Sequence, residues 1–131
     1  MLASTIILMP PLAVFEACFS VAFNLILLFE STGCKNLTFS VYLRPNILVQ
    51  NQFLISKVVS LGIVDFLKNL GLRDVQIKWP NDIYCGNRKI AGILIENSLK
   101  SNKVFNAVIG IGLNVNQVNF ISENKPTSIL N

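Results

Sequence analysis

Charged and amide side chains are concentrated in one segment of a chain that is otherwise strongly apolar. Between positions 78 and 96 they belong to Lys78, Asn81, Asp82, Asn87, Arg88, Lys89 and Glu96. A strand-rich core has little use for them, because a buried charge is costly unless it has a partner or a ligand. We therefore expect this segment to form the rim of a binding site for an anionic ligand.

The middle of the segment is predicted to fold as a β-hairpin. Gly86-Asn87 suits a two-residue loop with glycine in the first position, as a type II′ turn prefers. With this turn, the pairs expected across the hairpin are Cys85 with Arg88, Tyr84 with Lys89, and Ile83 with Ile90. Because side chains alternate along each strand, one face of the hairpin receives Asp82, Tyr84 and Lys89.

The expected register brings a lysine close to a carboxylate. Asp82 is then a diagonal neighbour of Lys89, about 7–8 Å away between backbones. The ammonium group would neutralise a substrate carboxylate or phosphate, while the acid would help to hold a metal or a second polar group. A surface ion pair of little energetic value is the alternative for these two residues, and a place in the core is the alternative for Trp79.

A second stretch suited to ligand binding is the strand expected at about 104–116. One of its faces is apolar and carries Ile109, Ile111, Leu113 and Val115. The other face carries Gly110, Gly112, Asn114 and Asn116. Glycine inside a strand often marks the close approach of a ligand or of another backbone. Two glycines followed by two amides would make a flat slot for a planar ring such as adenine, and tight packing under a helix is the alternative.

Known phosphate-binding fingerprints are absent from the sequence. A dinucleotide-binding G-x-G-x-x-G motif would need glycine at position 115, where Val115 stands, and no P-loop motif occurs. There is no histidine, which excludes a Ser-His pair and a histidine-rich metal site. The three cysteines are widely spaced without a C-x-x-C pair, which favours reduced thiols in a cytoplasmic protein.

The elements that must position these residues follow from the hydrophobic pattern. Alternation over 36–43 predicts a half-buried strand with Leu37, Phe39, Val41 and Leu43 on its inner face. A helix is expected at about 51–70, and Gly71 is expected to be its left-handed cap. Its apolar stripe at helical spacing is formed by Leu54, Val58, Leu61 and Val64, joined by Phe66, Leu67 and Leu70. A strand at 75–79 ends before Pro80. One helix among five strands predicts an α+β fold, with the helix packed on one face of a mixed β-sheet.

The length of 131 residues suits one domain. The formal net charge of +4 is mild and the basic residues are scattered, so a nucleic-acid partner is not expected. Residues 1–29 contain one charged residue, Glu16, and form an atypical apolar leader. A membrane span over Leu12–Phe29 is not favoured, because Glu16 and Asn24 interrupt it and no basic flank precedes it; a membrane anchor is the alternative that cell fractionation would test.

Three ordered motifs together resemble the catalytic domain of biotin protein ligases. They are Lys78-Trp79-Pro80-Asn81-Asp82, the run from Arg88 to Glu96, and the run from Gly110 to Gln117. Asn36 to Ser40, Arg44-Pro45 and Pro126-Thr127-Ser128 are similar to the same domain. The resemblance covers about residues 30–131, the central part of such a domain, and implies the biotin/lipoate ligase fold, which is similar to that of class II synthetases.

The resemblance implies an ATP-dependent ligase with a two-step reaction. The carboxylate of biotin attacks the α-phosphate of MgATP and gives biotinyl-adenylate and pyrophosphate. A lysine amine on a biotin carboxyl carrier domain of a biotin-dependent carboxylase then attacks this mixed anhydride. Biotin is thus a substrate, and ATP and Mg²⁺ are required.

Residue roles are also implied by the resemblance. Lys89 is the catalytic lysine and contacts the biotin carboxylate and the α-phosphate. Gly92 and Leu94 line the biotin slot together with Lys89. The residues expected at ATP are Lys78, Trp79, Asn81, Asp82, Gly110, Gly112 and Asn114, with Asp82 also expected at the magnesium ion.

One departure from the family affects the expected activity. The family has an arginine- and glycine-rich loop before the strand that matches Asn36 to Leu43, whereas no arginine precedes Arg44 here. We therefore expect a truncated ligase domain with weak or absent adenylate formation. The alternatives are a non-catalytic biotin- or nucleotide-binding remnant, and a relative of lipoate–protein ligases; Trp79 and the Gly-Ile-Leu run at 92–94 favour biotin.

Overall fold

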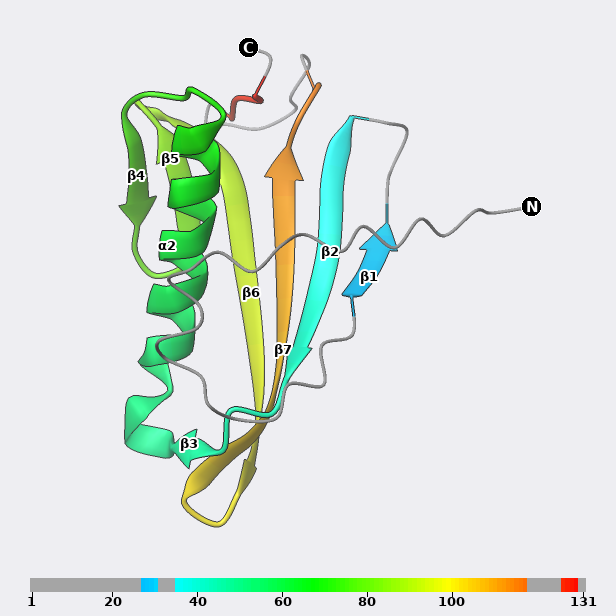
Figure 1. The fold of residues 1–131 in the computed structure, drawn as a ribbon, viewed down its shortest axis with the longest axis vertical. Coiled ribbons are helices and arrows are strands. Elements are labelled where there is room, and N and C mark those ends of the chain that lie inside the picture. Colours follow the sequence, from blue (N-terminus) through cyan, green and yellow to red (C-terminus); the bar gives the residue numbers. More distant parts are fainter. Residues whose placement is uncertain (1–26, 31–34, 118–125, 130–131) are drawn as a thin grey trace, which may run out of the picture.

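The structure, a computed structural model, describes residues 27–30, 35–117 and 126–129, with only the backbone described at 27–30. These residues form a seven-stranded sheet with one long helix against one of its faces (Figure 1). The elements are β1 (Leu27–Glu30), β2 (Asn36–Leu43), β3 (Ile47–Leu48), η1 (Val49–Asn51), α2 (Phe53–Asn69), β4 (Val75–Lys78), β5 (Asp82–Cys85), β6 (Arg88–Lys100) and β7 (Lys103–Asn114).

The strands lie in the order β1-β2-β7-β6-β5-β4, and β3 pairs with β7. Every strand pair in the described part of the chain is antiparallel. The predicted α+β class with a helix on one face is confirmed, but the expectation of a mixed sheet is wrong. Helix α2 carries the chain from β3 to the far edge of the sheet, where β4 pairs, among the described strands, with β5 alone. A helical connection is compatible with parallel pairing, so the sequence left the orientation open.

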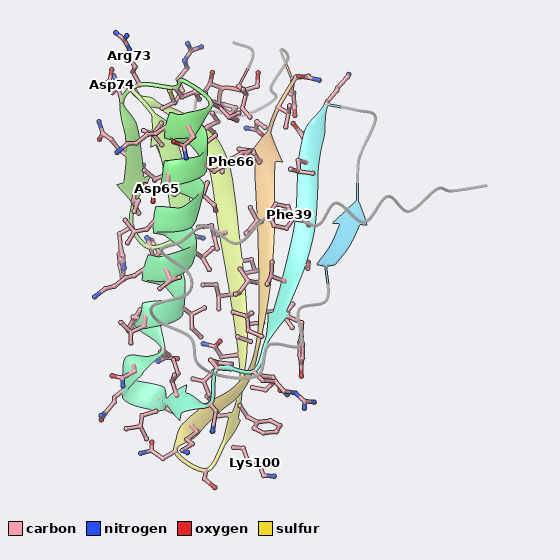
Figure 2. All side chains as sticks on the ribbon, in the orientation of Figure 1. Phe39, Asp65, Phe66, Arg73, Asp74 and Lys100 are labelled. Carbon is pink, nitrogen blue, oxygen red and sulfur yellow. The ribbon has the colours of Figure 1, made fainter. Side chains whose placement is uncertain are left out.

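Strand β2 has the predicted bounds and the predicted inner face. Leu43 is buried, and Leu37, Phe39 and Val41 pack against the core. Figure 2 shows Phe39 at the centre of the sheet, where β2 lies beside β7. The alternation of apolar and polar residues predicted this strand correctly, because one of its faces packs on the core and the other can be exposed to solvent.

Helix α2 occurs where it was predicted, but only part of its expected stripe is buried. The buried residues are Ile55, Ser60, Val64 and Leu67. Leu54 and Leu61, expected in the core, are 50% and 55% exposed. The expected stripe is correct at Val64 and Leu67 and wrong at Leu54, Leu61 and Leu70. Apolar residues occur on nearly every side of α2, so the period identifies a helix without selecting the face that meets the sheet. Asp65 is exposed, and its neighbour Phe66 packs against the core (Figure 2).

The end of α2 is the predicted glycine cap. Gly71 has φ +91°, and its N–H donates to the carbonyl of Lys68 at 2.9 Å. The N–H of Leu72 donates to the carbonyl of Leu67 at 3.2 Å. These two bonds form a Schellman motif, which satisfies carbonyl groups at the helix end. The motif turns the chain sharply into β4.

The two faces of the sheet differ in what covers them. One face packs against α2 and carries the buried core residues Ile83, Ile90, Ala91, Ile93, Ile109, Ile111 and Leu113. We call the other face the open face, because no helix among the described residues covers it (Figure 1). Exposed apolar side chains on it, such as Leu94 at 64%, stand in solvent.

Two predictions concern segments that are mostly outside the described residues. Of the apolar leader at 1–29, only the backbone of 27–29 is described, as part of β1. Of the tail at 118–131, only 126–129 is described. A search of the described ranges finds no helix with the length and apolar character needed to cross a membrane.

Candidate active site

A β-bulge decides which face of the sheet receives Lys89. Cys85 pairs with Arg88 and Tyr84 with Lys89, as predicted, but Ile83 pairs with Ala91. The expected pairing of Ile83 with Ile90 is wrong, because the register shifts between Ile83 and Tyr84. Ile90 and Ala91 are both buried in the core, with exposed fractions of 0% and 2%. The extra residue reverses the alternation, and Lys89 therefore shares the open face with the even-numbered positions that follow it.

The bulge places Lys89 in contact with Asp82. The Lys89 Nζ atom lies 2.6 Å from Asp82 Oδ1, and the two side chains are 35% and 24% exposed. Asp82 pairs directly with Gly92 across β5 and β6. A partly exposed ion pair contributes little to stability. Its value lies in holding an ammonium group at a fixed place on the open face.

Gly92 provides the room for this ion pair. A Cβ atom at Gly92 would lie 3.4 Å from both Cε and Nζ of Lys89 and 3.8 Å from Asp82 Oδ1. A side chain there would push against the ammonium group. Because glycine has no side chain, the strand surface beside the ion pair stays unobstructed, and a ligand can approach the ion pair there.

Three glycines lie together on the open face. Gly92 pairs with Gly112, and Leu94 pairs with Gly110; we call Gly92, Gly110 and Gly112 the glycine ledge. A Cβ atom at Gly112 would meet no atom of the described part of the chain within 4 Å, and one at Gly110 would touch only Leu94, at 3.8 Å. Internal packing therefore does not demand these two glycines. The alternative of a strand packed tightly under the helix is wrong, since the ledge faces away from α2.

The nucleotide-side residues expected from the sequence lie at the β5 side of the ledge. Lys78 pairs with Asp82 across β4 and β5, but its Nζ atom contacts Tyr84, 3.2 Å from Oη and 4.7 Å from the ring centroid. Trp79 is 74% exposed. Asn81 is also exposed, and its carbonyl accepts a hydrogen bond of 2.8 Å from the N–H of Ile93. The open face thus has a second ammonium group, which is held by Tyr84.

Tyr84 was not selected as a site residue by the sequence reasoning. It holds Lys78 through its ring and its hydroxyl, and it pairs with Lys89. The signal that could have found it is the alternation of β5, which puts Tyr84 on the same face as Asp82.

Asn114 is the last residue of β7, beyond Gly112 on the open face. A later segment of the chain forms hydrogen bonds with it. Its Nδ2 donates to the carbonyl of Thr127 at 3.0 Å, and its own carbonyl accepts from the N–H of Ile129 at 3.1 Å. The N–H of Thr127 donates to the carbonyl of Lys89 at 2.8 Å. Segment Pro126–Ile129 therefore links the end of β7 to the bulge that carries Lys89. No local pattern in the sequence predicted this link.

Most of the predicted site residues are brought together on one surface. Those that share the open face are Lys78, Asp82, Lys89, Gly92, Leu94, Gly110, Gly112 and Asn114. Trp79 and Asn81 lie in the connection from β4 to β5 at its border. Within the described residues, no three histidine, cysteine, aspartate or glutamate side chains gather as a metal-binding group.

A sequence model of the Biotin/lipoate A/B protein ligase family matches residues 27–114 of this chain. The chain belongs to that family. The predicted resemblance to the catalytic domain of biotin protein ligases is therefore confirmed at the level of the family, and the matched range includes the ion pair and the whole glycine ledge.

Members of the biotin/lipoate protein ligase family from plants and bacteria are similar in sequence. Biotin–protein ligase 1, chloroplastic, of Arabidopsis thaliana is 37% identical over 105 residues, which are 76% of this chain and 26% of the plant protein. Bifunctional ligase/repressor BirA of Escherichia coli is 41% identical over 61 residues, covering 47% of this chain and 19% of BirA. This chain therefore spans well under two thirds of the relatives that it matches.

A solved ligase structure has the same fold. The apo structure of biotin protein ligase from Aquifex aeolicus superposes with a TM-score of 0.64 at 27% sequence identity, covering 85% of this chain and 49% of that protein. The antiparallel sheet with a helix on one face is thus the architecture of this part of a biotin protein ligase catalytic domain.

Proposed function

We propose that this chain carries the biotin- and ATP-binding centre of a biotin–protein ligase. The proposal depends on one observation above all, the Lys89–Asp82 ion pair at 2.6 Å beside the side-chain-free surface of Gly92. An ammonium group fixed next to an empty strand surface suits a ligand with a carboxylate at one end and a flat or slender body. The names of the similar plant and Aquifex aeolicus proteins give biotin as that ligand for them.

The first proposed step joins biotin to AMP. A carboxylate oxygen of biotin attacks the α-phosphorus of ATP, the bond from this phosphorus to the bridging oxygen breaks, and pyrophosphate leaves with that oxygen. Two anions must approach one another for this bond to form. The Lys89 ammonium group would stand between them and stabilise the negative charge that develops on the phosphoryl oxygens.

The second proposed step transfers biotin to a carrier. The ε-amine of a lysine on a biotin carboxyl carrier domain attacks the acyl carbon of the adenylate, an amide bond forms, and AMP leaves while the amine loses a proton. The open face suits this step because a protruding lysine of a partner can reach it. A covered site would first have to open.

The residues at the β5 side of the ledge would hold the triphosphate. Lys78 would add its positive charge, and Trp79 would offer an exposed aromatic face. Mg²⁺ in such sites is held by one or two carboxylates together with substrate phosphates. Asp82, with Asn81 next to it, fits the protein's share of that donor set, and the ion would neutralise phosphate charge. The adenine would lie toward Gly110, Gly112 and Asn114.

Isotope exchange between pyrophosphate and ATP tests this function. Exchange that requires biotin, and that Lys89→Ala abolishes, is the expected result. Lys100→Ala is the matched control, because Lys100 lies at the end of β6 opposite to Lys89, where it pairs with Lys103 (Figure 2). The exchange is expected to be slow, since no arginine precedes Arg44. Calorimetry with biotin separates binding from turnover, and biotin affinity unaltered by Lys89→Ala would refute the proposal.

A further inference from the structure

A short turn joins β4 to β5 at the border of the open face. It comprises residues 79–81, which we call the β4–β5 turn, and the next residue, Asp82, forms the ion pair with Lys89. The side chains of Trp79 and Asn81 are exposed, and within the described ranges neither makes a hydrogen bond or an ion pair. These side chains are available to a ligand, and the position of the turn depends on its backbone contacts.

Two hydrogen bonds from outside the hairpin hold the backbone of the β4–β5 turn. The carbonyl of Asn81 accepts from the N–H of Ile93 on β6 at 2.8 Å. The carbonyl of Pro80 accepts from the hydroxyl of Ser56 on α2 at 3.2 Å. The first bond comes from a neighbouring strand and the second from the helix. The turn is therefore held between the sheet and α2.

Ser56 is placed for this contact by the packing of α2. The helix lies beside β4 and β5 (Figure 1), and the residue before Ser56, Ile55, is buried in the core at 2% exposure. Ser56 itself is half-buried. Because α2 covers the face of the sheet opposite to the open face, Ser56 would not touch a ligand there. Any effect of its hydroxyl on a ligand must pass through the β4–β5 turn.

A loop that is already fixed binds its ligand more tightly, because less conformational freedom is lost on binding. Trp79 and Asn81 are among the residues proposed to hold the triphosphate. Without the bond from Ser56, the turn would be tied to its surroundings at Asn81 and free to move at Pro80. The distance of 3.2 Å is long for a hydrogen bond between two oxygen atoms, so the expected contribution to ATP affinity is modest.

We propose that Ser56 is a positioning residue for the nucleotide, and that it holds the β4–β5 turn in the conformation that receives the triphosphate. This inference rests on the proposed function, because it takes the ATP phosphates to lie at this turn. Biotin binding does not depend on Ser56. Lys89 and Gly92 belong to β6, and Asp82 is kept in place by its pairing with Gly92.

Calorimetry on the full chain with ATP and with biotin tests the inference. Ser56→Ala removes the hydroxyl, and Ser56→Cys replaces it by a weaker thiol donor. Both variants should weaken ATP binding about two- to threefold, the lower end of the effect of one hydrogen bond. Biotin affinity and the melting temperature should stay close to those of the parent chain. Ser56→Thr keeps the hydroxyl and should bind ATP as the parent does.

The fluorescence of Trp79 gives a direct view of the turn, because Trp79 is the only tryptophan of the chain. In Ser56→Ala we expect a lower fluorescence anisotropy of Trp79 before ATP is added, since the turn moves more freely. Bound ATP should reduce the difference from the parent chain. A role of Ser56 in helix stability alone would not change this anisotropy, and an anisotropy equal to that of the parent would overturn the inference.

Ser60→Ala is the matched control, because Ser60 lies one turn later on α2 and is buried at 2% exposure. It should leave ATP affinity and the anisotropy of Trp79 unchanged. Unchanged ATP affinity in Ser56→Ala, with a clear loss in Asp82→Asn, would overturn the inference and leave the proposed function intact. Equal losses of ATP and biotin affinity, or an equal effect of Ser60→Ala, would indicate a general effect on the fold and also overturn it. Biotin affinity unaltered by Lys89→Ala would instead remove the proposed function itself.

Discussion

A Cβ atom at Gly92 would lie 3.4 Å from the ammonium nitrogen of Lys89. The two residues are three positions apart on β6, and simple alternation would put them on opposite faces. The bulge at Ile90 and Ala91 brings them onto one face. The catalytic candidate and the bare backbone beside it are therefore products of one irregularity in the hairpin.

Gly92→Ala should reduce biotin binding more than it reduces stability. The new methyl group would lie at the short limit of van der Waals contact with Lys89 Cε and Nζ, and we expect the flexible lysine to shift away from Asp82 in response. We expect at least a tenfold loss of biotin affinity by calorimetry, with a melting temperature close to that of the parent chain. An unchanged affinity would mean that Lys89 does not need its position beside Asp82.

Gly112→Ala should weaken ligand binding without lowering the stability of the fold. The methyl group would meet no described atom within 4 Å, and alanine in a strand is about 0.5–1 kcal/mol more favourable than glycine. We expect equal or slightly higher stability in denaturant unfolding, together with weaker binding of biotin or ATP. A variant that binds both ligands normally would show that the ledge is not a ligand surface.

The hydrogen bond from Thr127 to Lys89 should contribute to the position of the bulge. Thr127→Pro removes the N–H that donates to the carbonyl of Lys89 at 2.8 Å, whereas Thr127→Val keeps it and fills the same buried space. We expect Thr127→Pro to lower biotin affinity several-fold and to speed hydrogen exchange at residues 89–93, while Thr127→Val does neither. Equal effects of the two substitutions would assign the role to the side chain.

Tyr84 should act through Lys78 on the nucleotide. Tyr84→Phe removes the hydroxyl contact of 3.2 Å and keeps the ring under the ammonium group, and Tyr84→Leu removes both. An exposed cation–π contact contributes about 0.5–1 kcal/mol, so ATP affinity should fall about two- to fivefold in Tyr84→Leu and less in Tyr84→Phe. Biotin affinity, measured in parallel, should not change. A loss of biotin binding with normal ATP binding would contradict this role.

The orientation of α2 gives a prediction that is independent of function. Leu67→Ala should destabilise the chain by about 2–5 kcal/mol because it empties a fully buried site, whereas Leu61→Ala should cost within about 0.5 kcal/mol, as a surface change does. The exposed fractions of the two parent side chains are 0% and 55%. Chemical denaturation measures both, and a reversed order would mean that the helix packs by its other side.

Local chemistry in the sequence determined much of this protein. The alternation over 36–43, the glycine-first turn at Gly86-Asn87 and the cap at Gly71 were all predicted correctly, because each depends on residues that are close together in the chain. The motifs from Lys78 to Gln117 indicated the family for the same reason, since they are short and ordered. The apolar face of β7 and its glycine face were likewise fixed by alternation alone.

Tertiary structure decided the rest. The bulge that carries Lys89 is a property of the pairing between β5 and β6, and a one-residue shift in pairing moves every later side chain to the other face. The buried side of α2 depended on the sheet it meets, because an apolar helix offers more than one suitable face. Thr127 reaches the bulge that carries Lys89 only through a hydrogen bond between residues far apart in the chain, and such contacts leave no periodic signal in the sequence.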